Sequence, residues 1–541
     1  MLVAAAPAAA AAPAGQDPWK AAITDAALRG HVAVLASDTF RGRFPGTSGE
    51  DSTLAYLERQ FKALGLAPAV NGSYRQEVPL VRRTVRPTPA IRLTRTAGAA
   101  GTGELPAIRW GDDLSLSATV LDTALAVHGA EIVFAGYGIS APEMGWDDYQ
   151  GVDCRGKVVF VLATDPGRAP PDSTLFGGRA LTHYGLTATK QEMAAAHGAV
   201  GLIVMHDPDV VGFPFDILTA AVGRAKYDLA PAPGSQPRTP FAATVRKEVG
   251  LALLRAAGLD PAHEMGAAGR RGFHGRALGI AIDLAASITV ERARSYNMLG
   301  VLRGRTRPDE VVAYSAHWDH MGVGVPVAGD SIYNGAVDNA SGTAALLMLA
   351  GAYRDSGRPP ARSVLFWATT CEEQGLLGSY WYADHPVFPL AKTVALINMD
   401  ALFPFGADDQ MVVTGFGQSE LEDLLAKAVA PEGRTIAGDD SPETGAFYRS
   451  DHYPLAKKGV PAIFAIGESK ADTTQRRRLM RYVTSGYHKP QDELTPDWDT
   501  AGILQDVRCY YRLGRMLADG TSWPNWRATS EFRAARDAMR R

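Results

Sequence analysis

Metal-binding side chains recur through the second half of the chain. Two are histidines, His317 and His488, and three are carboxylates: Asp338, Asp400 and one member of the pair Glu372–Glu373. Zinc binds imidazole nitrogen and carboxylate oxygen, and catalytic zinc keeps one position open for water. If one carboxylate bridges two ions about 3.5–4 Å apart, each ion also has one histidine and one terminal carboxylate. The pattern therefore predicts a two-metal hydrolase.

Asp338 is the carboxylate that suits the bridge. It lies in a loop bounded by Gly and Ser, directly before an expected helix over residues 341–354. A side chain on such a loop can project between ligands that leave the ends of strands.

The adjacent glutamates can take separate roles. Neighbouring residues that leave a strand point to opposite sides, so one can bind metal while the other stays free as a general base, which typically gives about 10²–10⁴-fold in rate. The residues alone do not assign these roles to Glu372 and Glu373. Asp319 follows His317 by two residues and is expected to accept the other N–H of the imidazole. Tyr487 can donate its hydroxyl to a developing oxyanion.

Each of these residues also has a structural explanation. Asp338 with Asn339 can form a turn and a helix cap, and the glutamate pair can begin a solvated helix. The joint pattern favours chemistry, because ligands of one class follow successive strands. Four other residues are expected to be structural or peripheral: His320, His385, His452 and Cys371.

Three of the metal-binding segments are mainly apolar runs, at residues 311–317, 363–373 and 393–400. They are too continuous for half-exposed strands and are typical of buried parallel ones. In open α/β sheets the functional site lies beyond the carboxyl ends of the strands. The acids and imidazoles stand at those ends.

Length and composition set wider limits. A chain of 541 residues is expected to form two or more domains. Its content of 46% hydrophobic and 21% charged residues is ordinary for a globular protein. A net charge of −3 does not indicate binding to nucleic acid or to an anionic membrane. No apolar run reaches the roughly 18 residues of a membrane helix.

Residues 1–15 are rich in Ala and Pro and resemble the apolar part of a signal peptide, without its basic start. They predict a secreted or periplasmic protein, and a disordered leader is the alternative. The three cysteines, Cys154, Cys371 and Cys509, are too few for a disulfide framework.

Periodicity places the remaining elements around the metal-bearing strands. Leu54, Leu57 and Phe61 at helical spacing, with Gly65 as a stop, predict a helix over 49–64. An insert follows, with expected strands at 131–139, 157–165 and 200–207, a helix at 187–199, a strand and a helix within 240–260, and an irregular stretch at 208–239. Strands return at 277–290 and 295–304. A long Gly-rich loop is expected at 321–336, and the chain continues as strand 410–416, helix 419–429, loop 431–453, strand 460–466 and helix 499–518.

These motifs together resemble the co-catalytic di-zinc exopeptidases, a group that includes secreted bacterial leucine aminopeptidases, glutamate carboxypeptidase II and the catalytically inactive transferrin receptor. The matching segments are HWDH (317–320), VDNASGTAALL (337–347), CEEQGLLGS (371–379), NMD (398–400), SDHYPLAKKGVPA (450–462) and YH (487–488). They span about the last half of the chain, and residues 42–66 resemble the family's opening helix. Ligand type, order and spacing all agree with the family.

The resemblance implies a role for each candidate residue. Two zinc ions per chain are implied, one held by His317, Asp338 and Asp400, the other by Asp338, Glu373 and His488. It also implies Glu372 as general base, Asp319 as the residue that orients His317, and Tyr487 as the oxyanion donor.

The family's fold is α/β, a twisted mixed β-sheet with helices on both faces. The insert resembles a small β-rich protease-associated domain. The implied division is a leader at 1–15, the first part of the catalytic domain at 16–130, the insert at 131–275, the di-zinc peptidase domain at 276–525 and a tail at 526–541.

By analogy with bacterial relatives, the expected activity is aminopeptidase action, with peptides as substrates and water activated by the two zinc ions. Carboxypeptidase or dipeptidase action is the alternative and would need a basic residue for the substrate carboxylate, for which Arg449 is a candidate. A non-catalytic receptor is a further alternative, disfavoured by the intact ligands and base.

Overall fold

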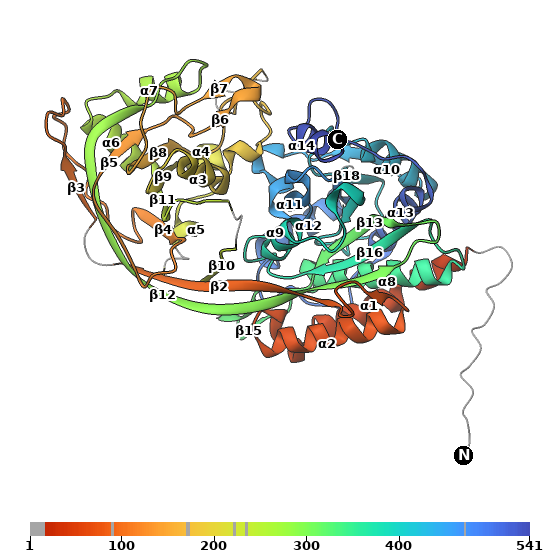
Figure 1. The fold of residues 1–541 in the computed structure, drawn as a ribbon. Coiled ribbons are helices and arrows are strands. Elements are labelled where there is room, and N and C mark those ends of the chain that lie inside the picture. The colour runs from red at the N-terminus through yellow and green to blue at the C-terminus, as the bar shows by residue number, and fades with distance from the viewer. Residues whose placement is uncertain are drawn as a thin grey trace. The chain divides into compact units, whose positions relative to one another are not determined.

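The computed structural model describes residues 17–87, 91–168, 172, 174–219, 223–232, 236–469 and 472–541 (Figure 1). The expected leader at 1–15 lies outside these residues. The chain divides into two compact units. The first contains the chain up to Val78, Arg294–Asp439 and Arg449–Arg541, and the second contains Pro79–Ala293 and Asp440–Tyr448. The expected insert at 131–275 lies within the second unit, which starts earlier and ends later.

The first unit is built on a mixed sheet with the strand order β19-β18-β20-β17-β13-β16-β12. Its strands are β12 (Arg276–Leu302, of which 298–302 pair here), β13 (Arg307–His317), β16 (Arg362–Thr369), β17 (Thr393–Asn398), β18 (Gln410–Val413), β19 (Thr435–Gly438) and β20 (Ala462–Glu468). β13 is parallel to both β16 and β17, whereas β12 is antiparallel to β16.

Helices cover both faces of this sheet, as two neighbouring residues of β16 demonstrate. Phe366 contacts Tyr353 of α8 (Gly342–Asp355), and Trp367 contacts Tyr382 of α9 (Leu377–Asp384). Because successive strand side chains alternate between faces, the two helices lie on opposite sides. The sequence prediction of a mixed sheet with helices on both faces is confirmed.

The other helices of the first unit mostly complete this core. They are α1 (Asp25–Leu35), α2 (Ser48–Ala63), α10 (Leu421–Val429), α11 (His452–Lys457), α12 (Thr473–Ser485), α13 (Ala501–Asp519) and α14 (Arg533–Met539). α2 and α13 confirm the helices predicted at 49–64 and 499–518. Thr47 caps α2 by accepting a hydrogen bond from the Gly49 N–H, and Leu57 and Phe61 are fully buried. α14 lies within the residues expected to form a tail.

The parallel strands end at a common edge. In the register, His317 lies opposite Thr369, and Ser315 lies opposite Asn398. The residues of β16 and β17 are all buried, and so are residues 311–317 of β13. The prediction of buried parallel strands is therefore confirmed, and the segments that follow them begin close together.

The second unit contains a sheet with the order β12-β5-β8-β9-β11-β4. Its strands and helices include β2 (Arg75–Pro87), β3 (Arg92–Arg95), β4 (Leu114–Ala118), β5 (Ala124–Phe134), β8 (Val158–Leu162), α3 (Thr187–Ala196), β9 (Gly201–His206), β10 (Lys226–Leu229), β11 (Phe241–Arg246), α6 (Lys247–Ala256) and α7 (Pro261–Ala268). β8 and β9 are parallel and completely buried, which explains the apolar runs at 157–165 and 200–207.

Several predicted boundaries are wrong. The two strands expected at 277–290 and 295–304 form one strand, β12, in which the intervening residues 291–294 remain extended. The loop expected at 431–453 contains β19, and the one expected at 321–336 contains a hairpin of β14 (Gly322–Val327) and β15 (Asp330–Tyr333). The irregular stretch at 208–239 includes three short elements, α4 (Pro208–Val211), α5 (Asp216–Thr219) and β10.

Among the described residues, the helices are too short or too polar to cross a lipid bilayer.

Candidate metal centre

Each predicted ligand follows an element of the first unit. His317 is the last residue of β13, and Asp400 comes two residues after β17. Asp338 lies in η5 (Ala336–Ser341), the turn before α8, whereas Glu373 follows β16 and His488 follows α12. Five segments separated in sequence thus meet at the edge where the parallel strands end.

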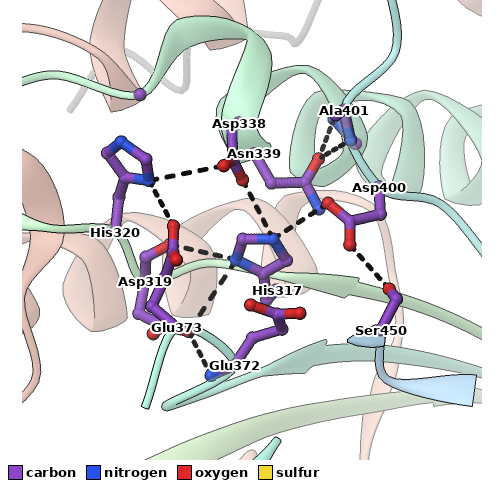
Figure 2. Close-up of polar contacts among 12 residues, drawn as sticks. His317, Asp319, His320, Asp338, Asn339, Glu372, Glu373, Asp400, Ala401 and Ser450 are labelled. Carbon is purple, nitrogen blue, oxygen red and sulfur yellow. Dashed lines mark hydrogen bonds and ion pairs between the residues drawn. The ribbon is translucent and has the colours of Figure 1, made fainter. Parts of the chain in front are cut away.

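His317 lies against two of the predicted carboxylates (Figure 2). Its Nε2 atom is 3.2 Å from Asp338 Oδ1 and 3.0 Å from Asp400 Oδ1. The His317 side chain is 1% exposed. These three residues form the first ligand cluster.

His488 lies against a second pair of carboxylates. Its Nε2 atom is 3.2 Å from Asp338 Oδ2 and 3.1 Å from Glu373 Oε2. The two oxygens of Asp338 therefore face different histidines. A carboxylate that bridges two cations has this arrangement, with one oxygen for each.

The spacing and type of these atoms fit zinc. A tetrahedral ion with bonds of about 2.0–2.1 Å places its ligand atoms about 3.3 Å apart. The four imidazole–carboxylate distances of 3.0–3.2 Å are close to this value. Imidazole nitrogen and carboxylate oxygen are also the donors zinc prefers. Among the described residues, two groups of side chains lie close enough together to surround a metal ion: His317 with Asp338 and Asp400, and His320 with Asp338 and Glu373.

The cluster carries an excess of negative charge. Burial alone would lower the pKa of His488, but hydrogen bonds to Asp338 and Glu373 outweigh burial and raise it to about 10. His317 behaves in the same way, and Asp400 contributes most to raising its pKa well above the ordinary value. Protons on the two imidazoles offset only part of the negative charge of the three carboxylates. Metal binding displaces such protons.

Asp319 differs from its expected role. The backbone carbonyl of Asp319 accepts the hydrogen bond from His317 Nδ1 at 3.0 Å, while its carboxylate Oδ1 is 3.9 Å from that nitrogen. Asp319 Oδ1 instead accepts a hydrogen bond from the Glu372 N–H at 3.1 Å. β13 ends at His317, so the strand geometry that would put both side chains on one side does not continue. Burial raises the pKa of Asp319 to about 8.

The two adjacent glutamates make different contacts. The Glu373 carboxylate belongs to the second cluster with His488. The Glu372 N–H donates to Asp319, and within the described part of the chain the Glu372 carboxylate accepts no hydrogen bond. Burial raises the pKa of Glu372 well above its ordinary value. One glutamate is thus engaged with a histidine and the other remains available.

Tyr487 stacks on a predicted ligand. Its ring centroid is 3.9 Å from that of His488, and 45% of the residue is exposed. Partial burial, followed by the charges of Asp338 and Glu373, raises the pKa of Tyr487, so its hydroxyl stays protonated. It can act as a hydrogen-bond donor at the open side of the cluster.

His320 was expected to be structural or peripheral, and the structure places it against the second ligand cluster. Its Nδ1 atom is 2.6 Å from Glu373 Oε1 and 3.9 Å from Asp338 Oδ2. The turn after β13 brings it into the cluster, which strand periodicity does not predict. The repeated histidine in the sequence 317–320 was the one available signal. His452 and Cys371 are both buried.

Two further residues fix the loop before Asp338. Asp492 accepts hydrogen bonds from the N–H groups of Val337 and Asp338 at 2.8 and 3.0 Å. Arg43 is 1% exposed and donates to the carbonyls of Trp318 and Gly335, each at 2.8 Å. Arg43 therefore joins the segment after His317 to the one before Asp338. Neither residue carries a sequence signal of this role.

Comparison with known proteins agrees with this centre. Residues 297–511 match peptidase family M28. This part of the chain belongs to peptidase family M28. The M28 segment contains all five predicted ligands and lies mostly in the first unit.

Three curated proteins illustrate the range of relatives. The chain is 34% identical over 127 residues to aminopeptidase NAALADL1 of Mus musculus, 30% over 180 residues to probable glutamate carboxypeptidase VP8 of Zea mays, and 27% over 227 residues to leupeptin-inactivating enzyme 1 of Streptomyces exfoliatus. These matches cover 23%, 31% and 40% of this chain. They span only 16%, 24% and 47% of the respective relatives.

Solved structures with a similar fold include an aminopeptidase from Aneurinibacillus sp. strain AM-1, with a TM-score of 0.46 and 18% identity. The match covers 93% of this chain and 96% of that chain. A second is a zinc aminopeptidase from Bacillus subtilis, with a TM-score of 0.41 and 18% identity, covering 94% and 99%.

Proposed function

We propose that this M28 protein is a metal-dependent exopeptidase that holds two zinc ions and removes residues from the amino end of peptides. The observation that carries the proposal is the placement of Asp338, whose two oxygens face two different histidines. One ion is assigned to His317, Asp338 and Asp400. The other is assigned to Asp338, Glu373 and His488.

Bound zinc would supply positive charge that polarises the scissile carbonyl and favours the ionisation of water. The protein's own part is to hold the ligands in place. Ser450 donates to Asp400 Oδ2 at 2.6 Å, and Asp492 and Arg43 hold the loop of Asp338. These contacts direct Asp400 and Asp338 toward the cluster.

Glu372 is the proposed general base. Its carboxylate is not engaged by a ligand histidine, and Asp319 fixes the backbone from which it projects. It would take a proton from the attacking water and pass that proton to the nitrogen of the leaving group. Tyr487, held against His488, would donate its hydroxyl to the carbonyl oxygen as negative charge develops there.

The choice of the amino end rests on names of relatives, an aminopeptidase and a probable glutamate carboxypeptidase among them. The maize relative favours carboxypeptidase action as a second candidate. Arg449, exposed beside Ser450, would be its carboxylate-binding residue.

Two further parts of the proposal concern regions beyond the centre. The leader-like residues 1–15 support a secreted or periplasmic location. The parallel buried strands β8 and β9, with α3, support a protease-associated domain at 131–275.

The variant Glu372→Gln tests the mechanism. It should lower turnover of a short peptide by at least about 10²–10⁴-fold, while zinc content measured by mass spectrometry stays at two ions per chain. Glu248→Gln, at an exposed position of α6, is the matched control and should retain full activity. Full activity in Glu372→Gln would exclude the mechanism.

A peptide panel tests the direction of cleavage. Peptides with a free amino end, a blocked amino end or a blocked carboxyl end are compared, with a chelator-treated sample as background. Aminopeptidase action predicts that only amino blocking prevents hydrolysis. Loss on carboxyl blocking would favour the second candidate, and zinc binding without hydrolysis of any peptide would favour a non-catalytic protein.

A further inference from the structure

We propose that His320 is a positioning residue for the zinc ion on the Glu373 side. Its Nδ1–H group holds one oxygen of Glu373, so that the other oxygen faces the position shared with Asp338 and His488. The inference rests on the proposed two-metal function and adds a residue that the ligand set does not contain.

The two oxygens of Glu373 have different partners. His320 Nδ1 is 2.6 Å from Oε1, whereas His488 Nε2 is 3.1 Å from Oε2. The shorter distance is typical of a charge-assisted hydrogen bond. It is well below the separation of about 3.3 Å between two ligands of one tetrahedral ion. His320 therefore acts on the carboxylate and leaves the metal position to Glu373.

The surroundings of His320 support this role. The residue is 0% exposed, and among the described residues its Nε2 atom has no hydrogen-bond partner. A buried unpaired nitrogen opposes folding, so packing alone would favour an apolar residue here. Gly335 makes room for the ring, because a side chain at this position would collide with it. The fold thus accommodates an imidazole whose short polar contact, at Nδ1, is with Glu373.

The other terminal ligand is held in a parallel way. Asp400 presents Oδ1 to His317, and the Ser450 hydroxyl donates to its Oδ2 at 2.6 Å. Each terminal carboxylate therefore has one oxygen held by a hydrogen-bond donor, His320 or Ser450, and one oxygen directed at the cluster. Ser450 affects the ion on the Asp400 side, which makes it a matched counterpart of His320.

Zinc titration of chelator-stripped protein, read by calorimetry, tests the inference. Asp400→Asn and Glu373→Gln provide backgrounds in which only the Glu373-side or only the Asp400-side ion is retained. In the Asp400→Asn background, His320→Leu should weaken zinc binding about 10–100-fold, the effect typical of lost outer partners. His320→Asn retains an N–H near Nδ1 and should restore most of that affinity. In the Glu373→Gln background, His320→Leu should change little, whereas Ser450→Ala should weaken binding.

The outcomes separate the inference from the proposed function. Failure of the unmutated protein to bind two zinc ions would overturn the two-metal function. Two ions in the unmutated protein, with unchanged affinity in Asp400→Asn/His320→Leu, would overturn the inference alone. It would also be overturned by an equal loss in both backgrounds, or by an Asn variant no better than the Leu variant.

Discussion

In the second unit, Lys190 is fully buried near Asp148 and Asp165, both 1% exposed, and its amine donates to the Tyr137 carbonyl. In the first unit, the carboxylates of Asp338, Glu373 and Asp400 surround imidazoles rather than a lysine. Both clusters are buried and charged, but the positive charge in the second unit belongs to a fixed ammonium. In the first unit it belongs to histidines that can exchange a proton for a metal.

The pKa values express the same difference. Burial lowers the pKa of Lys190 to about 8 and raises that of Asp165 to about 6, so each of these groups is moved toward neutrality. In the first unit the carboxylates dominate, and they raise the pKa of His488 to about 10 against the effect of burial. The buried cluster of the second unit already contains a positive charge on Lys190, which suits a structural role. The cluster of the first unit, whose carboxylates lie around imidazoles at metal-ligand spacing, is the proposed cation site.

Asp338→Asn should have the largest effect, because Asp338 faces both histidines. Zinc content should fall from two ions per chain to none after gel filtration, and peptide hydrolysis should fall to the chelated background. Lys190→Met, in the other cluster, should leave zinc content at two. Retention of both ions by Asp338→Asn would contradict the bridging role.

Lys190→Met should instead reduce stability. Removal of the ammonium leaves buried carboxylates uncompensated, which typically costs about 3–5 kcal/mol of unfolding free energy. Lys157, paired with Glu131 at 2.7 Å on a partly exposed surface, offers a matched control. Lys157→Met should cost no more than about 1 kcal/mol. Denaturant unfolding measures the unfolding free energy of both variants. Equal losses in Lys190→Met and Lys157→Met would contradict the stabilising role of the buried ammonium.

How much of this could be foreseen depends on how local the signals are. The helix α2 follows from Leu54, Leu57 and Phe61 alone, and the parallel strands follow from their apolar runs. The continuity of β12 and the presence of β19 depend on pairing with distant strands, which a single sequence does not record.

The candidate centre shows the same limit. The structure brings together the predicted ligands, since their residue types and positions after strands are visible in the sequence. The contacts of Asp319 and His320 depend on the turn after His317, and the separate contacts of Glu372 and Glu373 depend on the turn after β16. Turns that end a strand change the direction of side chains within two residues, so periodicity fails there.

Asp148→Asn should act through stability alone, as a change in the pH dependence of stability. Burial raises the pKa of Asp148 to about 7. Its contribution to stability is therefore present below the unfolded value near 4 and is lost as pH rises through about 7. In the unmutated protein, Asp148 should make the unfolding free energy fall by at most about 1.4 kcal/mol per pH unit between pH 4 and 7, and the variant should lose this dependence. Calorimetry of chelator-treated protein measures it, with exposed Asp153→Asn as control. An unchanged slope in Asp148→Asn would contradict this assignment.

The most direct test of the central claim is diffraction at the zinc absorption edge from crystals grown with zinc. The account predicts two anomalous peaks about 3.5–4 Å apart. One should lie beside His317 and Asp400, the other beside His488 and Glu373, with one oxygen of Asp338 toward each. A single peak, or peaks remote from Asp338, would contradict it.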